Sequence, residues 1–428
     1  MTTPLSLNDI AERLQGYDPQ ALSARHVNDF LAQLVQPVRE QETLALMQAH
    51  GRILARDVIS PISVPPHDNS AMDGYALRGA ELQAGQASRL KVVGTALAGA
   101  AWQGTVSTGE CVRIMTGAIM PAGLDTVAPQ ELVQAEGDMV LVPPGLLQAG
   151  DNRRLLGEDL MAGQPALPAG ARLTPAACGL LASLGLPTVP VWRRPKVAYF
   201  STGDEILSLG EAPREGAVYD SNRYTVAGMV QSLGCELIDM GVVRDEPAAL
   251  EQAFRDAAAQ ADAVITSGGV SVGEADHTKA MMKKLGDVAF WRIAMRPGRP
   301  MAVGRITQGE RAALLFGLPG NPVAVMVTFA AFVRPALQQL MGWQAPALPM
   351  LKAKSQEALR KKPGRTEYQR GIVSTNAAGE LVVRTTGNQG SGVLSSMVQA
   401  NGLIVLSHHQ GHVAVGDAVD VMMFDGHL

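Results

Sequence analysis

The sequence predicts a multidomain protein that combines α/β and β domains, and three features support this fold class. The chain has 428 residues, more than one hydrophobic core usually serves, so about three domains are expected. Its 45 glycines and 26 prolines exceed the usual share and favour β-rich and α/β domains with many turns. Strands alternate regularly with helices only in the second half, which predicts a doubly wound sheet there.

The first half of the chain shows two different patterns. Apolar residues recur at helical spacing near the start, as in Val27, Phe30 and Leu34, and this indicates two or three helices. Short β-type runs separated by Gly and Pro turns follow, and then loops return with one short helix. We therefore expect a partly helical linking domain that is discontinuous, at residues 1–56 and 150–192, around an inserted β domain at residues 57–149.

The second half begins with three strand–helix repeats, KVAYFST to NRYTVAGMVQSLG, ELIDMGVV to PAALEQAFRDAAAQ, and ADAVITSGG to ADHTKAMMKKLG. Such alternation predicts a parallel, doubly wound sheet. Two further β runs, another strand and a long apolar helix complete this α/β domain at residues 193–343. After a Pro-rich linker, strands with short turns predict a C-terminal β domain at residues 347–428.

Charge and composition exclude several classes of protein. The net charge is −4 and the pI is near 6.1, so no global basic field favours nucleic acid or an anionic membrane. The three cysteines are far apart and lack C-x-x-C spacing, which argues against a disulfide framework or a structural zinc site. The polar N-terminus lacks the apolar core of a secretion signal. We expect a cytoplasmic protein without nucleic-acid or membrane partners.

Polar residues follow the predicted strands of the α/β domain, where ligands bind in sheets of this kind. Glu205 follows the first strand, and the run SGGVSVGEAD, with Gly268, Gly269 and Asp276, follows the third. A Ser-Gly-Gly turn exposes N–H groups that can hold phosphate, and nearby carboxylates suit Mg²⁺. Taken alone, however, Gly-Gly is more often a simple turn, and Asp276 could cap the next helix.

Charged groups outside these loops have competing interpretations. The run PPHDNSAMDGYAL contains Asp68, Ser70 and Asp73, which could simply form an Asx-turn. The run RRLLGED carries Arg154 and Asp159, whose opposite charges could pair on the surface. The run RIAMRPGRP holds three arginines around a Pro-Gly turn and suits an oxyanion clamp of guanidinium groups; they are Arg292, Arg296 and Arg299.

Three histidines in the run SHHQGHV resemble a metal cluster, but a polar hairpin turn is the favoured interpretation because no fourth ligand is visible; they are His408, His409 and His412. No P-loop, no dinucleotide fingerprint and no Ser-His-Asp spacing is present either, which disfavours kinases and ordinary dinucleotide enzymes.

Eight motifs of this chain occur in the order seen in molybdopterin molybdenumtransferases and the related C-terminal domain of gephyrin. They are DNSAMDGYA, RIMTGA, RRLLGED, STGDE, SGGVSVGEAD, PGRP, GLPGNP and TTGNQGSG. The chain resembles this family from about Asn28 to Val421. The resemblance implies an elongated homodimer whose chains have four domains, the α/β domain being the molybdopterin-binding one. It also implies an active cleft between the α/β and C-terminal domains of one subunit and the β domain of its partner.

The resemblance assigns residue roles, which we carry over as expectations. The catalytic acids implied are Asp73, Asp159, Glu205, Asp245 and Asp276, of which Glu205, Asp245 and Asp276 are candidate ligands of Mg²⁺. For substrate binding the resemblance implies Thr116 and Arg154. The runs described above add further candidates, which are Asp68, Ser70, Ser267, Gly268, Gly269, Pro319 and Pro322. The residues implied to hold molybdate are Arg296, Arg299, Arg370 and Ser391.

Two departures from the family pattern concern the molybdate pocket. The family commonly has lysines in the PGKP element, where this chain has Arg296 and Arg299, and often a serine where this chain has Ala324. Arginine keeps the positive charge and offers two donors to an oxyanion. One lost hydroxyl should cost on the order of 1 kcal/mol. We expect molybdate binding to survive with altered geometry.

The activity implied is insertion of molybdate into adenylylated molybdopterin with release of AMP, the final step of molybdenum cofactor biosynthesis. Two alternatives remain. A molybdopterin adenylyltransferase resembles only residues 195–342, and a non-catalytic assembly scaffold would bind without turnover. Further partners implied are the adenylyltransferase itself and the molybdoenzymes that receive the cofactor.

Overall fold

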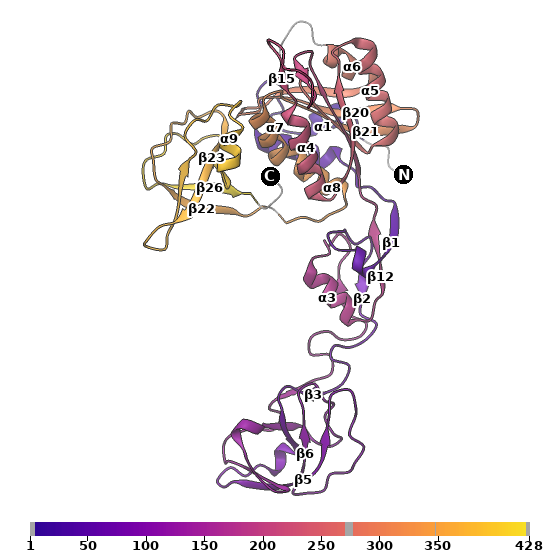
Figure 1. Cartoon of the computed structure of the whole chain (residues 1–428), viewed down its shortest axis with the longest axis vertical. Helices are drawn as coiled ribbons and strands as arrows, with labels where there is room; N and C mark the ends of the chain where they lie inside the picture. Colours follow the sequence, from indigo (N-terminus) through magenta and orange to yellow (C-terminus); the bar gives the residue numbers. More distant parts are fainter. Residues whose placement is uncertain (1–4, 270–276, 347, 425–428) are drawn as a thin grey trace.

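The computed structural model describes residues 5–269, 277–346 and 348–424. It consists of four structural units (Figure 1). The α/β domain and the C-terminal domain lie side by side at one end of the elongated molecule. The inserted β domain lies at the other end, and a narrow linking domain joins them (Figure 1). The predicted multidomain α/β plus β fold is confirmed.

The α/β domain is built on a six-stranded sheet in which only the fifth strand in sheet order runs antiparallel to the other five. In sheet order these strands are β16 (Glu236–Val243), β13 (Lys196–Thr202), β17 (Ala263–Ser267), β21 (Arg311–Leu318), β20 (Pro300–Gln308) and β18 (Gly286–Arg292). The parallel strands β13, β17 and β21 end at one edge, so the loops that follow them meet there.

Helices cover both faces of this sheet. Val197 and Tyr199 of β13 belong to one core and Ala198 and Phe200 to the other, as the alternation of a strand requires. The first face carries α4 (Ser221–Leu233), α7 (Pro322–Thr328) and α8 (Arg334–Leu340). The second face carries α5 (Pro247–Gln260) and α6 (His277–Leu285).

The predicted apolar helix is continuous from α7 to α8 through a π-helical turn at Phe329–Val333. Among the described residues, this Pro322–Leu340 helix is the one that is long and apolar enough to cross a membrane, but 83% of its apolar window is buried inside the protein. Its composition is therefore explained by its place in the core of the α/β domain.

The two N-terminal helices belong to the α/β domain, whereas residues 1–56 were all expected to belong to the linking domain. Both α1 (Leu7–Arg13) and α2 (Ala24–Leu34) pack against the α/β domain. Phe30 meets Trp291 edge to face at 5.0 Å, and the Arg305 guanidinium donates to the carbonyls of Leu5 and Leu34. The apolar stripe of α2 is as expected, but its partner Trp291 lies 261 residues after Phe30 in the sequence.

The linking domain begins at β1 (Gln41–Ala45), which pairs with β12 (Thr188–Trp192). Further short pairs follow toward the β domain: β2 (Val58–Ile59) with β11 (Pro165–Leu167), and β3 (Asn69–Ser70) with β10 (Arg153–Arg154). Helix α3 (Pro175–Ser183) is capped by the Thr174 hydroxyl and packs on this unit. The β1–β12 pair joins the two segments expected to form one discontinuous domain, whereas β2 and β3 fall within residues 57–149, the range expected for the inserted β domain.

The inserted β domain holds a six-stranded sheet around two small cores. Its strands are β4 (Gly74–Leu77), β5 (Ser88–Ala96), β6 (Glu110–Ile114), β7 (Thr126–Pro129), β8 (Gln134–Glu136) and β9 (Met139–Val142). Short 3-10 turns at Leu46–Gln48, Gly79–Glu81 and Gln130–Leu132 complete the first half of the chain.

The C-terminal domain is a closed ring of strands, because β25 pairs with both β26 and β23. Its elements are β22 (Met350–Ser355), β23 (Thr366–Thr375), β24 (Leu381–Thr385), β25 (Gly402–Leu406), β26 (Ala418–Met423) and α9 (Ser395–Gln399). The short strand β19 (Met295–Arg296), from the α/β half of the chain, pairs in parallel with β23. This pairing fixes the two domains against each other.

Candidate functional site

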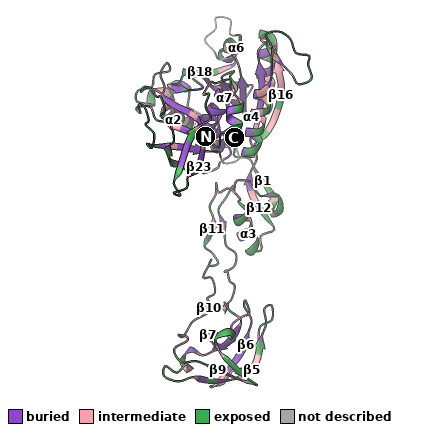
Figure 2. Ribbon diagram, turned by 60° about the vertical axis from the view of Figure 1, so that its left-hand side comes forward, coloured by how far each residue is buried: buried purple, intermediate pink, exposed green. Residues whose placement is uncertain are grey.

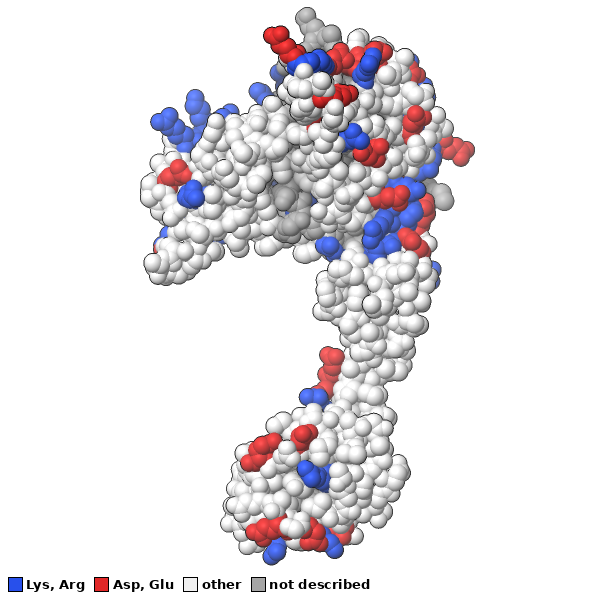
Figure 3. All heavy atoms as spheres, in the orientation of Figure 1, with Lys and Arg blue, Asp and Glu red and all other residues white. Residues whose placement is uncertain are grey.

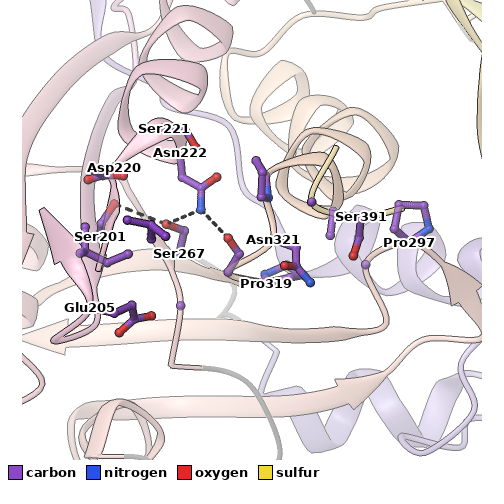
Figure 4. A pocket seen from close by; sticks show the side chains of 18 of the residues that line it. Ser201, Glu205, Asp220, Ser221, Asn222, Ser267, Pro297, Pro319, Asn321 and Ser391 are labelled. Carbon is purple, nitrogen blue, oxygen red and sulfur yellow. Dashed lines mark hydrogen bonds between the residues drawn. The ribbon is translucent and has the colours of Figure 1, made fainter. Parts of the chain in front are cut away.

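A cavity of about 740 Å³ lies where the parallel strands of the α/β domain end and the C-terminal domain begins (Figure 4). Its lining comes from the loops after β13, β17 and β21 and from the short parallel pair of β14 (Ile206–Leu207) and β15 (Val218–Tyr219). The segment 296–300 and residues 389–392 complete it. The volume falls within the usual range of about 300–1,000 Å³ for small-molecule sites.

Buried hydroxyl groups tie the cavity floor together. The Tyr199 hydroxyl lies 2.8 Å from Ser201 Oγ and 2.7 Å from Ser267 Oγ, and its burial raises the pKa of Tyr199 above the ordinary value. Asn222, at the start of α4, donates to Gly320 O at 2.8 Å and to Ser267 Oγ at 3.4 Å (Figure 4). One side chain therefore holds the β17 loop and the β21 loop in register.

Sequence reasoning named Ser267 but missed the other members of this network. A usable signal was present, since Tyr199 and Ser201 are polar residues inside a fully buried strand, and such groups require partners. Asp220 and Asn222, at the N-terminus of α4, also line the cavity and were missed. Their Oδ2 and Oδ1 atoms are buried without a hydrogen-bond partner in the described part of the chain.

The Ser-Gly-Gly turn after β17 lines the cavity as expected. Gly268 has φ +92° and Gly269 has φ +63°, a region that side chains disfavour. A Cβ on Gly268 would lie 2.3 Å from the carbonyl oxygen of Thr202, and one on Gly269 would lie 2.5 Å from the Thr278 side chain. The backbone thus reaches the cavity without side chains in the way, as a phosphate-binding turn requires.

The GLPGNP loop after β21 forms another wall of the cavity. Pro319, Pro322 and Ala324 all line it, so two expected residues and one departure from the family pattern lie in the same wall. The Val323 N–H donates to Ser391 O at 3.1 Å, which fixes the C-terminal domain to the first turn of α7. Glu205 and Ser391 lie on opposite sides of the cavity in the view of Figure 4.

The residues expected to hold molybdate meet at the junction of the two domains. Arg296 is exposed and lines both the large cavity and a smaller one of about 250 Å³, while Arg370 lines the smaller cavity and is buried. Arg370 donates from Nε to Ser396 Oγ at 2.9 Å and from Nη2 to Gly390 O at 2.9 Å. It therefore also holds the loop that carries Ser391. Burial, then the Arg296 charge, lowers the pKa of Arg370.

Two other arginines of the expected clamp lie outside the cavity linings. Arg299 is exposed, and its backbone oxygen accepts from Ile293 N at 2.7 Å. Arg292 is exposed in β18, and its backbone N–H donates to Pro19 O at 2.8 Å. Of the three arginines of RIAMRPGRP, Arg296 lines these cavities, and Arg370 of the C-terminal domain lies beside it.

The expected Mg²⁺ ligands are only partly brought together. Glu205 lines the cavity and is exposed, whereas Asp245 accepts from Thr278 Oγ1 at 3.4 Å beside the glycine turn. Asp276 lies outside the described residues, so the triad stays a prediction. Within the described ranges no group of three His, Cys, Asp or Glu residues could hold a metal ion; one of the three histidines considered above, His412, accepts from Lys361 N.

The remaining expected residues lie in and near the β domain, at the far end of the molecule from the cavity (Figure 1). Asp73 accepts from Thr116 N and Thr116 Oγ1, both at 2.7 Å. Asp68 accepts from Leu156 N at 2.7 Å, and the Ser70 hydroxyl, which is buried, donates to Met72 O. Arg154 and Asp159 are exposed. A single chain does not bring these residues to the cavity.

The Asp73–Thr116 pair allows a pH test. Hydrogen bonds from the Thr116 N–H and then its hydroxyl lower the pKa of Asp73 below 3.8. We expect Thr116→Val to raise this pKa toward, but not up to, 3.8, because the larger backbone contribution remains. In the wild type the stabilisation is complete above pH 3.8 and is lost as the pH falls through the lowered value. Carboxyl ¹³C NMR titration measures the pKa; an unchanged value in Thr116→Val would contradict the assignment.

The fold and the cavity define a class of protein: a multidomain enzyme whose α/β domain binds an anionic small molecule at the ends of its parallel strands. Three family models match the chain in order. They are the MoeA N-terminal region (domain I and II) at residues 22–185, the probable molybdopterin binding domain at residues 198–339, and the MoeA C-terminal region (domain IV) at residues 352–424.

Relatives match along nearly the whole chain. The molybdopterin molybdenumtransferase of Haemophilus influenzae is 44% identical and is covered over 96% of its length by 92% of this chain. That of Nostoc is 37% identical, with 96% of this chain and 95% of the relative covered. The chain belongs to the molybdopterin molybdenumtransferase family.

A solved structure agrees with this assignment. The molybdopterin biosynthesis moeA protein of Pyrococcus horikoshii superimposes with a TM-score of 0.81 at 27% identity, over 95% of this chain and 100% of that one. The gephyrin of Dictyostelium discoideum is 30% identical over 90% of this chain and 59% of its own length. The resemblance to both groups, expected from the motifs, is confirmed.

Proposed function

We propose that this protein inserts molybdenum from molybdate into adenylylated molybdopterin and releases AMP. The observation that carries the proposal is the meeting of two kinds of anion-binding group in one cavity. The glycine turn at Gly268 and Gly269 offers backbone N–H groups for a phosphate. Across the cavity, Arg296 and Ser391 offer donors for an oxyanion.

The chemistry rests on position rather than on a protein nucleophile. Molybdate is itself the electrophile, so the chain has to hold it beside the dithiolene sulfurs of the pterin substrate. Asn222 holds the two loops that bind the substrate in fixed register, and this preorganisation stabilises developing charge without rearrangement. Glu205, with substrate phosphate oxygens, suits Mg²⁺, which would offset the pyrophosphate charge when bound.

The site is completed, in our proposal, by the β domain of a second copy of the chain. The β domain, whose strands β4 and β6 adjoin Asp73 and Thr116, lies at the opposite end of the molecule from the α/β and C-terminal domains (Figure 1). Apolar side chains are also exposed along the thin neck that carries the β domain, including Ile59 at 48%, Leu155 at 48% and Met161 at 46%. Most residues of the neck are exposed or half-buried (Figure 2), so an elongated homodimer would cover surface that one chain cannot bury.

An adenylyltransferase is the second candidate function, since the α/β domain alone supports it. Nothing in that activity needs the arginine junction that β19 and β23 build between the α/β and C-terminal domains, and this favours insertion. The third candidate function is scaffolding without turnover. The open glycine turn and the accessible carboxylate of Glu205 favour an enzyme instead. The expected cytoplasmic location and the contacts with acceptor molybdoenzymes belong to the same proposal.

The test is incubation of the full chain with adenylylated molybdopterin, Mg²⁺ and molybdate. We expect AMP release together with active cofactor, measured by reconstitution of an apo-molybdoenzyme. ATP consumption with metal-free molybdopterin would indicate the adenylyltransferase instead. Substrate binding without either product would indicate the scaffold.

A further inference from the structure

The N-terminal segment 5–22, which we call the strap, crosses one edge of the α/β sheet and has no role in the activity proposed above. Strand β18 is the last in sheet order, so one side of its backbone has no strand partner in the described sheet. At the end of this strand the N–H groups of Arg292 and Ala294 donate to the strap. Their acceptors are Pro19 O at 2.8 Å and Leu22 O at 2.7 Å. The strap thus satisfies backbone groups that an edge strand leaves unpaired.

Side chains bind the strap to the same strand. Tyr17 stacks on Phe30 with ring centroids 6.0 Å apart, and Phe30 meets Trp291 edge to face. The Tyr17 hydroxyl closes this triangle, because it accepts from Trp291 Nε1 at 2.9 Å. Leu22, which is 1% exposed, pairs with the fully buried Ile293. Backbone and side chains of the strap therefore both hold the end of β18.

The end of β18 continues directly into the turn that carries Arg296. Ala294 donates its N–H to the strap, and its oxygen accepts from Thr366 N of the C-terminal domain at 2.8 Å. Two residues later, Arg296 belongs to β19, which pairs with β23, and it lines both cavities. The turn is closed by Ile293 N, which donates to Arg299 O at 2.7 Å. The position of the turn therefore depends on the strap as well as on β23.

We propose that the strap is a positioning clamp for the Arg296 turn. Residues 17–22 line neither cavity, but they fix where the Arg296 guanidinium stands. Backbone hydrogen bonds exposed to solvent open locally at low free-energy cost, so without the clamp the turn would sample several positions. The inference rests on the proposed function, which gives Arg296 its role. Nearly all of the strap precedes residue 22, where the first matched family model begins.

The experiment compares Leu22→Ala with Ile10→Ala in the full-length protein. Both changes remove a buried aliphatic side chain of the strap, since Leu22 is 1% and Ile10 is 0% exposed, so both should lower the melting temperature. Ile10 belongs to α1, which binds the beginning of β18 through Leu7 N and the Asp287 carboxylate at 3.0 Å. Leu22 instead adjoins the end of the strand. The pair therefore separates loss of stability from loss of the clamp.

Amide hydrogen exchange reports the clamp without turnover. The N–H groups of Arg292 and Ala294 should exchange faster in Leu22→Ala than in Ile10→Ala, each measured relative to strand β17 as an internal reference. A milder variant, Tyr17→Phe, removes one hydroxyl and keeps the ring, so the fold should persist. It should speed the same two amides roughly two- to tenfold, the factor that one hydrogen bond contributes.

Kinetics give the second readout. The KM for molybdate should rise roughly tenfold in Leu22→Ala, less than the ~100-fold loss that a displacement of the order of 1 Å can cause. This KM should stay near the wild-type value in Ile10→Ala. The KM for adenylylated molybdopterin should stay unchanged in both variants, because the glycine turn belongs to a different loop. Leu22→Ile, which keeps the side-chain volume, should behave as the wild type does.

Salt distinguishes positioning from a general electrostatic effect. Positive and negative side chains are interspersed on the face of the α/β domain shown in Figure 3, and such exposed charges are screened at high ionic strength. The clamp contacts named above are backbone hydrogen bonds and contacts of uncharged side chains. The molybdate KM of Leu22→Ala relative to the wild type should therefore be the same at low and high salt. A ratio that falls to one at high salt contradicts the clamp.

Two further results overturn the inference. One is equal exchange of the Arg292 and Ala294 amides in Leu22→Ala and Ile10→Ala, and the other is an equal KM for molybdate in these two variants. If the wild-type protein shows no turnover, calorimetric binding of molybdate takes the place of KM. Weaker binding in Leu22→Ala alone, together with faster exchange, then supports the clamp while the proposed function fails.

Discussion

Gly268→Ala should lower kcat/KM about 100-fold, because a misplacement of the order of 1 Å at a positioning group has that effect. The new Cβ would stand 2.3 Å from the Thr202 carbonyl oxygen, so the turn or the end of β13 has to move. The turn that we propose to bind the substrate phosphate directly follows Ser267, whose hydroxyl contacts Tyr199 and Asn222, so a shift of the turn also disturbs these contacts. Steady-state kinetics with adenylylated molybdopterin measures the loss.

Gly210→Ala is the matched control. Gly210 has φ +93°, nearly the value at Gly268, but a Cβ there meets nothing within 4 Å. Both variants therefore carry the strain of an alanine in this region of φ, and only Gly268→Ala adds the clash. Equal activity of the two variants would show that the turn does not hold the substrate, provided that both retain the wild-type circular dichroism.

Asp73→Ala and Glu205→Ala should each reduce activity about 100-fold or more, as removal of a charge-stabilising group does. Mixed after dissociation and reassembly, the two inactive proteins should recover about a quarter of the wild-type activity, since half of randomly paired dimers are mixed and each keeps one intact site. The reason is that Glu205 lines the cavity of the α/β domain, whereas Asp73 belongs to the β domain at the other end of the chain (Figure 1). Each site would therefore take its two groups from different chains.

The control for this complementation is a mixture of Glu205→Ala with a second variant of the same cavity, Ser391→Ala. Both changes lie in the cavity of their own chain, so in a mixed dimer one cavity lacks the Glu205 carboxylate and the other lacks the Ser391 hydroxyl. Neither site is intact, and no recovery is expected. Recovery in the control as well, or its absence in both mixtures, would contradict a site shared between subunits.

Local patterns were sufficient for the elements of the α/β domain. The strand Glu236–Val243 and the helix Pro247–Gln260 occur with the boundaries read from ELIDMGVV and PAALEQAFRDAAAQ, because a proline at the first helical turn and a change from strand to helical period are both local signals. The positions of Glu205, Gly268 and Pro319 followed from the rule that ligands bind at the ends of parallel strands.

Patterns of this kind did not locate the two N-terminal helices. The apolar stripe of α2 indicates that this face of the helix must be buried; it consists of Val27, Phe30, Leu31 and Leu34. The stripe does not indicate which surface covers it, and in the structure this surface includes Trp291 and Phe329. An amphipathic face specifies that burial is needed and leaves the choice of partner to long-range packing.

The sequence by itself determined the family and those cavity residues that follow the parallel strands, such as Glu205, Gly268 and Pro319, because these depend on motifs and on local periodicity. Only the tertiary structure decided which of the arginines face a cavity. Arg296 and Arg370 come together because β19 pairs with β23, a strand some 70 residues later, while Arg299 is exposed and does not line either cavity. Contacts across such separations depend on the register of strand pairing, which the side chains of either segment alone do not specify.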